Sequence, residues 1–207
     1  MIDRASWAAV WQELGTTGSA GEDLHRRLVE CWSQKHRHYH TLQHLRECFE
    51  HFGQARDQML RPPEVAVALW FHDAFYEPAR EDNEQRSADW LRDCALGAGL
   101  PAATAQRLHD MVMATVDHMP QRDPDTQWLV DIDLSILGAE TRRFDESDEQ
   151  VRREFAHVAE PEWRVGRRKK LQGFLDRPRL YGTDHFHSML ETRARQNVMR
   201  ALKRLDA

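Results

Sequence analysis

Apolar residues recur along most of the chain at the three- and four-residue spacing typical of helices that bury one face. One stretch departs from this pattern, because residues 65–71 (Val-Ala-Val-Ala-Leu-Trp-Phe) have no polar face at all. A helix that is apolar all round belongs in the interior of a protein. Pro62 and Pro63 precede the stretch and suit a first helical turn. The pattern therefore predicts a central buried helix that ends at His72 and Asp73.

The same spacing predicts helices on both sides of the central one, whereas alternating patterns typical of strands do not persist. Before the central helix, the predicted helices are 6–14, 22–32 and one that opens within residues 35–44. After it, they are 82–96, 102–116, 128–137, 151–158, 163–175 and 186–205. Glycine and polar residues predict a loop at 15–21 and a turn at 123–125. Gly138 is expected to cap the helix that precedes it. The fold class expected from the pattern is all-α.

Composition narrows the class of protein. The chain has 207 residues, of which 41% are hydrophobic and 30% charged, as in ordinary globular proteins. Its net charge of −5 provides no basic field for nucleic acid, and no apolar run approaches the ~18 residues of a membrane span. Three cysteines without a C-x-x-C motif, and an N-terminus unlike a signal peptide, fit a reducing compartment. We expect a cytoplasmic protein with neither nucleic acid nor membrane as partner.

The central helix ends in an imidazole and a carboxylate side by side, His72 and Asp73. Buried polar groups are costly unless something satisfies them. The two side chains could hydrogen-bond each other in the last helical turn, which is the simpler reading of an isolated pair. They could also bind a divalent transition metal, for which imidazole and carboxylate are good ligands.

Other polar groups emerge from apolar surroundings in the same way. His40 and His44 are four residues apart, which places them on one face if both are helical. The residues three and four positions from Asp133 are all apolar, so its carboxylate is expected to be buried and to need a cation. Asp131 has more mixed neighbours and could instead serve as a helix-start charge. These groups together could form a mixed nitrogen and oxygen metal site.

Four segments in this order carry a family resemblance. They are residues 37–44 (Arg-His-Tyr-His-Thr-Leu-Gln-His), 71–76 (Phe-His-Asp-Ala-Phe-Tyr), 82–88 (Asp-Asn-Glu-Gln-Arg-Ser-Ala) and 131–138 (Asp-Ile-Asp-Leu-Ser-Ile-Leu-Gly). The chain resembles the HD superfamily of metal-dependent phosphohydrolases, whose ligands occur in the order His, His-Asp, Asp. The resemblance is to a bacterial branch without an established substrate, and it extends over most of the chain.

The resemblance implies an HD-domain-like bundle of about eight to ten helices in a single domain, residues 1–207. Its core is expected to span about 22–140, followed by a helical extension of about 141–207. The extension could cover the site or form a homodimer face.

The resemblance also implies roles for single residues. His44, His72, Asp73 and one of Asp131 and Asp133 would bind the metal, and the burial argument selects Asp133. The ion could be manganese, iron, cobalt, nickel, zinc or magnesium. In this interpretation Asp73 belongs to the catalytic centre as well as to the ligand set.

Three further side chains each have a functional and a structural reading. His40 occupies the position of the leaving-group acid in cyclic-nucleotide phosphodiesterase relatives, or is a surface histidine at a helix start. Glu84 could be an acid or base, could orient a metal-bound water, or could be a helix-start charge. His118 could bind a second metal or a substrate phosphate, or simply end its helix.

The expected substrate is a phosphomonoester or phosphodiester of a nucleotide-like small molecule, cleaved by a metal-activated water. Arg37, Arg86 and Arg167 are the candidates for binding its phosphate, although solvated arginines are the simpler reading. No glycine-rich phosphate loop or G-x-S-x-G motif occurs. The alternatives are a di-metal oxygenase of the HD type, which needs His118 or another ligand for the second ion, and a non-catalytic ligand-binding module stabilised by metal.

Overall fold

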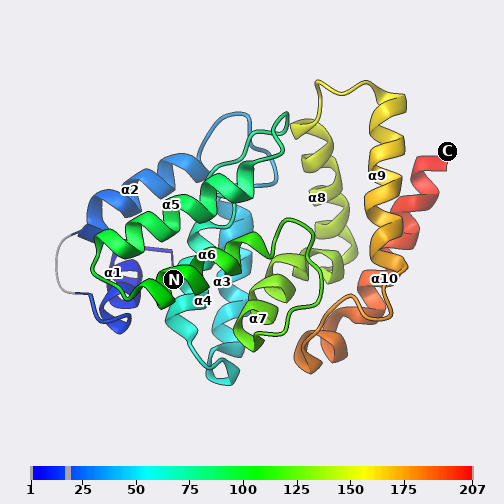
Figure 1. The fold of residues 1–207 in the computed structure, drawn as a ribbon. Coiled ribbons are helices and arrows are strands. Elements are labelled where there is room, and N and C mark those ends of the chain that lie inside the picture. Colours follow the sequence, from blue (N-terminus) through cyan, green and yellow to red (C-terminus); the bar gives the residue numbers. More distant parts are fainter. Residues whose placement is uncertain (1, 17–19, 207) are drawn as a thin grey trace. The chain divides into compact units, whose positions relative to one another are not determined.

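The computed structural model describes residues 2–16 and 20–206, and within them the chain is all-helical, as the sequence pattern predicts (Figure 1). Ten α-helices and two short 3₁₀ helices are present in this described part, without a strand. No helix there is both long and apolar enough to cross a membrane. Residues 17–19 of the predicted 15–21 loop lie outside the described residues.

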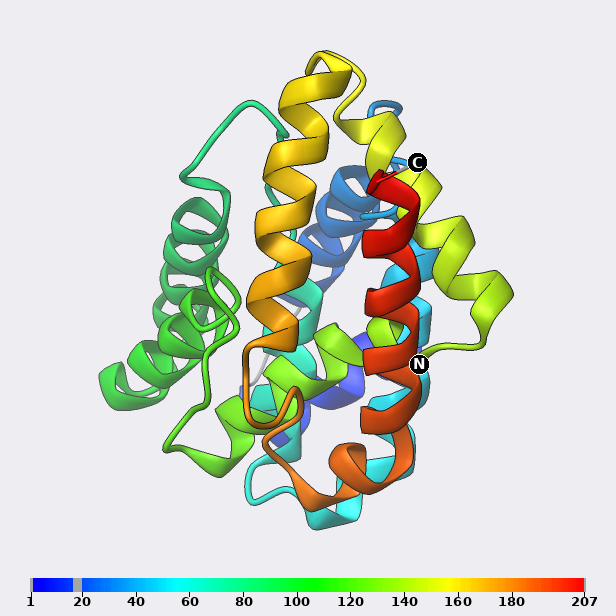
Figure 2. The same cartoon turned by 90° about the vertical axis from the view of Figure 1, so that its right-hand side faces the viewer.

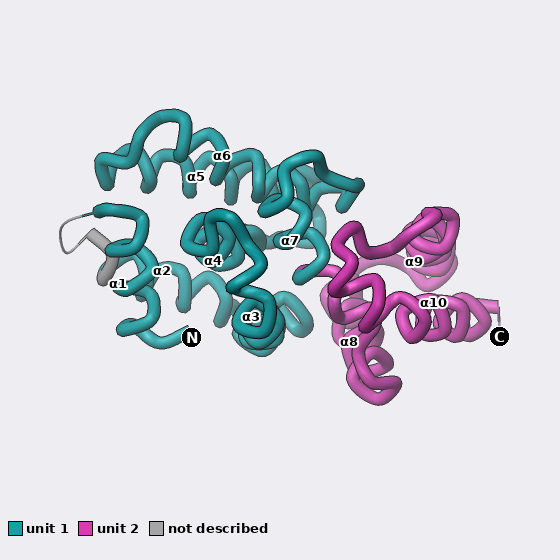
Figure 3. The backbone as a smooth tube through the Cα atoms, turned by 90° about the horizontal axis from the view of Figure 1, so that it is seen from below, with its two compact units in different colours: residues 1–132 teal, residues 133–207 magenta. Residues whose placement is uncertain are grey.

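Backbone contacts divide the chain into two compact units, Met1–Ile132 and Asp133–Ala207 (Figure 3). The predicted division into a core and a C-terminal extension stays a prediction. The elements of unit 1 are α1 (Arg4–Glu13), α2 (Ala20–Trp32), α3 (Leu42–Ala55), η1 (Arg56–Gln58), α4 (Pro62–Phe71), α5 (Asn83–Gly97), α6 (Ala102–Met113) and α7 (Pro124–Asp133), whose last residue is the first of unit 2.

Helix α4 is the centre of unit 1. It contacts α1, α3, α5 and α6, which lie around it in Figure 3. Residues 65–71 are all buried, so the apolar run has the environment that its pattern predicts. Arg107 of α6 donates to the buried carboxylate of Glu64 in the first turn of α4, with 3.0 Å between Nε and Oε2. The central helix therefore fixes the position of whatever follows Phe71.

Helix α3 begins later than the sequence pattern suggested. Thr41 is its N-cap, and the Thr41 hydroxyl accepts a hydrogen bond from the backbone N–H of Gln43. His40 therefore lies in a turn before the helix, whereas His44 lies within its first turn. The prediction that these two histidines share one helical face is wrong, because the capping threonine stands between them.

Helix α7 begins earlier than predicted, at Pro124. The carboxylate of Asp123 accepts hydrogen bonds from the backbone N–H groups of Asp125 and Thr126. Burial raises the pKa of Asp123, but these bonds and Arg61 outweigh it and hold that pKa below its ordinary value. The residues expected to form a turn at 123–125 are thus the start of a helix. Asp123 accepts hydrogen bonds from N–H groups of the first helical turn, which have no partner within the helix.

Unit 2 contains η2 (Leu134–Gly138), α8 (Thr141–Glu154), α9 (Glu160–Leu175) and α10 (Asp184–Asp206). The long helix α10 packs against η2, α8 and α9, and Figure 2 shows α9 and α10 side by side. Helix α8 ends at Glu154, so the predicted helix 151–158 was placed too late. Its first two turns bury only Phe144 and Ser147, which is too narrow a stripe for an apolar pattern to reveal.

The prediction that Gly138 caps the preceding helix is wrong, because this glycine does not have the left-handed conformation of such a cap. It is the last residue of η2, and it is not among the described glycines with positive φ. A Cβ at this position would lie 2.6 Å from Cβ of Leu190 on α10. Glycine is required here because a helix passes close to the backbone.

Candidate metal centre

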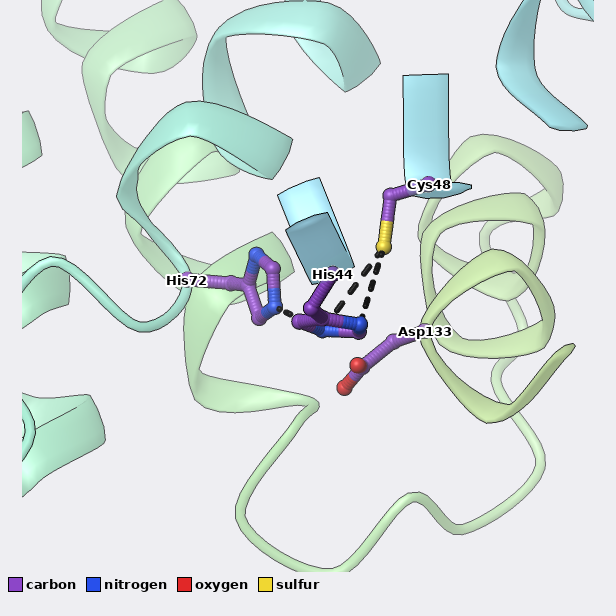
Figure 4. Close-up of side chains that lie close together, drawn as sticks. All are labelled: His44, Cys48, His72 and Asp133. Atoms are coloured by element: carbon purple, nitrogen blue, oxygen red, sulfur yellow. Dashed lines mark hydrogen bonds between the residues drawn. The ribbon is translucent and has the colours of Figure 1, made fainter. Parts of the chain in front are cut away.

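Two buried imidazoles face each other in unit 1. His44 is the third residue of α3, and His72 directly follows the last residue of α4. Their Nε2 atoms are 3.2 Å apart (Figure 4). The end of the apolar helix and the capped start of α3 therefore bring together two residues 28 positions apart.

The other ring nitrogens of this pair have their own partners. Nδ1 of His72 is 2.8 Å from the carbonyl oxygen of Leu69, and a carbonyl only accepts, so Nδ1 carries the hydrogen. Nδ1 of His44 is 3.1 Å from the hydroxyl of Tyr39. Metal-binding histidines usually have such a partner on the second nitrogen, which fixes the tautomer and directs the first nitrogen at the ion.

Asp73 completes a triangle with the two imidazoles. Its Oδ2 is 3.1 Å from Nε2 of His72 and 3.9 Å from Nε2 of His44, and the side chain is 14% exposed. Ligands that bind one ion at about 2.1 Å lie about 3.0 Å apart at a right angle and about 3.4 Å apart at the tetrahedral angle. The distances of 3.1, 3.2 and 3.9 Å between these three atoms are close to what one shared ion requires.

Two more side chains approach the imidazole pair. Ligand atoms of His44, Cys48, His72 and Asp133 all lie within 4.8 Å of one another, so this group could hold a metal ion (Figure 4). Asp133 is the last residue of α7, a helix whose other nine residues belong to unit 1. Cys48 was not predicted from the sequence, although its spacing of four from His44 on one helix was a usable signal.

The burial argument that selected Asp133 over Asp131 is wrong in its premise. Asp131 is fully buried and accepts a hydrogen bond of 2.8 Å from Gln127, whereas Asp133 is partly exposed. The reason is the change from α-helix to 3₁₀ helix after Asp133, which moves the apolar residues at 136 and 137 out of α-helical register. Asp133 nevertheless belongs to the potential metal group, and its role as a ligand stays a prediction.

His40 lies at the exposed side of the triangle. Its Nε2 is 4.0 Å from Oδ2 of Asp73, and its ring stacks on Tyr76 with centroids 3.9 Å apart. Arg37 holds this region together, because its buried guanidinium donates to the backbone carbonyls of His40, Asp73 and Ala74. These bonds join the turn that carries His40 to the residue that carries the predicted catalytic carboxylate.

The metal group found among the described residues does not include the predicted ligand Asp73, and it does not include the remaining predicted residues either. Glu84 lies in the first turn of α5, and Arg86 pairs with Glu77 at 3.5 Å. His118 has a positive φ of 53°. Arg167, in unit 2, donates to Asp148 over 2.7 Å. Their assigned roles stay predictions.

No protein-family model, curated protein or solved structure matches this chain.

Proposed function

We propose that the chain is a metal-dependent phosphohydrolase that cleaves a phosphomonoester or phosphodiester of a nucleotide-like small molecule. The observation that carries the proposal is the triangle of potential ligand atoms, Nε2 of His44, Nε2 of His72 and Oδ2 of Asp73. The order of these residues along the chain, with an aspartate at the end of α7, supports the HD-type reading of the sequence.

A positive charge at the centre of the triangle would satisfy all three atoms at once. With its hydrogen on Nδ1, a neutral His72 directs the Nε2 lone pair at a carboxylate oxygen 3.1 Å away. Two electron-rich atoms at that distance repel unless a cation lies between them. A proton bridges two atoms, whereas a metal ion accommodates the third atom, Nε2 of His44, in the same sphere.

A bound divalent ion would supply the positive charge that orients a phosphoryl group and makes a water molecule more acidic. His40 is the proposed general acid, since it lies at the partly exposed side of Asp73, where a leaving group can reach it. Arg37 acts here as a positioning residue, because its bonds to the carbonyls of His40 and Asp73 fix the distance between acid and carboxylate.

The test is metal content measured together with hydrolysis. The wild-type protein, incubated with manganese, cobalt or zinc, should retain metal after desalting and hydrolyse aryl phosphomonoesters or phosphodiesters. Asp73→Ala should lose the hydrolysis and most of the metal, and Asp110→Ala on the exposed face of α6 should lose neither. Retained metal without hydrolysis of any phosphate ester would favour the non-catalytic module, and two ions per chain would favour the di-metal oxygenase. A wild-type protein that binds no metal would refute the proposal.

A further inference from the structure

Unit 1 contains a pocket of about 410 Å³, formed by the end of α2, the start of α3 and the loop that joins them. Among the described residues that line it, Lys35, Arg37 and Arg46 are positively charged and none is negatively charged. The whole chain has a net charge of −5, so the pocket has the opposite sign to the chain as a whole. It therefore combines the size of a small-molecule site with the charge of an anion site.

Two of the three cations are available to a ligand. The side chains of Lys35 and Arg46 are exposed, and they have neither an ion-pair nor a hydrogen-bond partner within the described part of the chain. Arg37 differs, because its buried guanidinium donates to three backbone carbonyls and contributes mainly its charge to the wall. Lys35 and Arg46 are therefore the groups that can bind an anion directly.

The start of α3 adds polar groups to the same pocket. Its N-cap Thr41 and its second residue Gln43 line the pocket, and its first turn contains no acidic residue. The N–H groups at the start of a helix carry partial positive charge and commonly bind phosphate. A hydroxyl, an amide, an ammonium and guanidinium groups around one pocket are a donor set suited to a phosphate group.

We propose that this pocket is a second site, apart from the metal centre, that binds the phosphate group of a small molecule through Lys35 and Arg46. The pocket adjoins the metal centre, because Trp32 lines it and packs against His72 with ring centroids 5.3 Å apart. The phosphate belongs either to a separate molecule or to a second position of the substrate, and the two sources present the same chemistry. Binding at the pocket does not depend on the proposed hydrolysis.

The experiment is calorimetric titration of the full-length protein with inorganic pyrophosphate, after treatment with a chelator and desalting. Lys35→Ala/Arg46→Ala should bind pyrophosphate roughly tenfold or more weakly than the wild type, since it loses two charge-assisted contacts. Arg142→Ala/Lys169→Ala removes two exposed cations from unit 2, with the same change in net charge, and is the matched control. Its affinity should stay within about twofold of the wild type, because distant exposed charges are screened.

Three results would overturn the inference. They are an equal loss of affinity in both double variants, an unchanged affinity in Lys35→Ala/Arg46→Ala, and a wild type that does not bind pyrophosphate at millimolar concentration. Each would leave the metal centre intact, because the titration is carried out on chelator-treated protein. Far-ultraviolet circular dichroism checks that both double variants are folded.

Hydrolysis by the metal-loaded protein distinguishes the two sources of phosphate, and this arm rests on the proposed function. If the pocket holds a second phosphate of the substrate, Lys35→Ala/Arg46→Ala should raise KM for adenosine 3′,5′-bisphosphate and not for p-nitrophenyl phosphate. Unchanged KM values for both, together with weakened pyrophosphate binding, would assign the pocket to a separate phosphorylated molecule. A wild type that hydrolyses no phosphate ester would refute the proposed function and leave the result of the pyrophosphate titration standing.

Discussion

At the scale of single residues, His40 has a proposed role that can be separated from metal binding. A general acid contributes about 10²- to 10⁴-fold when the leaving group is a poor one. His40→Ala should therefore lower kcat by about that factor for phenyl phosphate and by much less for p-nitrophenyl phosphate, whose leaving group needs no proton. Metal content should be unchanged. His38→Ala, an exposed neighbour in the same loop, is the control.

An equal loss for both phosphate esters would contradict the assignment of His40 as general acid. It would instead indicate that the ring positions Asp73, which its Nε2 approaches to 4.0 Å. Elemental analysis of the variant is then the deciding measurement, because displacement of Asp73 would also reduce the bound metal.

The hydroxyl of Tyr39 is expected to tune metal affinity through His44. It lies 3.1 Å from Nδ1 of that imidazole, and removal of such a partner typically weakens metal binding by about 10- to 100-fold. Tyr39→Phe should show this loss in a zinc titration. Tyr181→Phe deletes a buried hydroxyl that donates to the carbonyl of Leu134 in unit 2, so it should lower stability and leave zinc affinity unchanged. Equal affinities for wild type and Tyr39→Phe would contradict the expectation.

At the residue scale, the sequence predicts the location of a side chain best where that side chain adjoins a strongly patterned element. His72 and Asp73 were identified because they end an all-apolar helix, and the structure places them beside His44. Cys48 was missed because a cysteine on an apolar helical face is ordinarily core. The relative burial of Asp131 and Asp133 was predicted wrongly, because counting neighbours three and four residues away assumes an uninterrupted α-helix.

At the scale of elements, the approach of α10 to η2 depends on Gly138. A methyl group there would meet Cβ of Leu190 at 2.6 Å and the hydroxyl of Tyr181 at 3.1 Å, and overpacking costs about 1–3 kcal/mol. Gly138→Ala should therefore lower the free energy of unfolding by about that amount. In Gly166→Ala, within α9, the new methyl group meets nothing within 4 Å, and stability should rise by up to about 1 kcal/mol.

Chemical denaturation of the two glycine variants tests this expectation. Equal stability changes of the same sign would show that the close approach at Gly138 is relieved by movement of α10. Opposite signs are expected, because one methyl group is inserted into a packed contact and the other only removes backbone freedom from the unfolded chain.

Element boundaries were predicted well where an apolar stripe is wide and poorly where capping or charge dominates. The central helix starts at Pro62, where the proline pair placed it. Helix α8 was misplaced because its surface is almost entirely charged and only a narrow stripe is buried. The starts of α3 and α7 depend on hydrogen bonds from backbone N–H groups to Thr41 and Asp123, which periodicity does not detect.

At the scale of the whole molecule, the all-α class could be predicted because helical spacing recurs throughout the chain and strand alternation does not. The boundary at residue 133 could not be predicted from composition, because no linker, low-complexity segment or change in composition marks it, and the division near residue 140 came only from the family resemblance. The change occurs instead inside a continuous helical run, where α7 passes directly into η2.

Acid should destabilise the molecule through carboxylates that the fold keeps ionised. Burial raises the pKa of Glu191, but hydrogen bonds from the N–H groups of Leu180 and Tyr181 and from Arg195 outweigh it and hold that pKa below 4.5. The folded state then binds fewer protons than the unfolded state. The stabilisation is therefore complete above the ordinary value of 4.5 and is lost as the pH falls through the lower folded pKa.

Comparing the stability of Glu191→Gln with that of the wild type across pH measures the stabilisation by this ionised carboxylate. Near neutral pH the variant should be less stable by roughly 1.5–3 kcal/mol, since it loses hydrogen bonds to a charged acceptor. The difference in Tm should shrink as the pH falls through the lowered pKa of the folded state, because protonation makes the wild-type carboxyl neutral as well. Glu149→Gln, at an exposed position on α8, should match the wild type throughout. A difference for Glu191→Gln that stays constant from neutral to acid pH would mean that the side chain stabilises unit 2 by packing rather than by its charge.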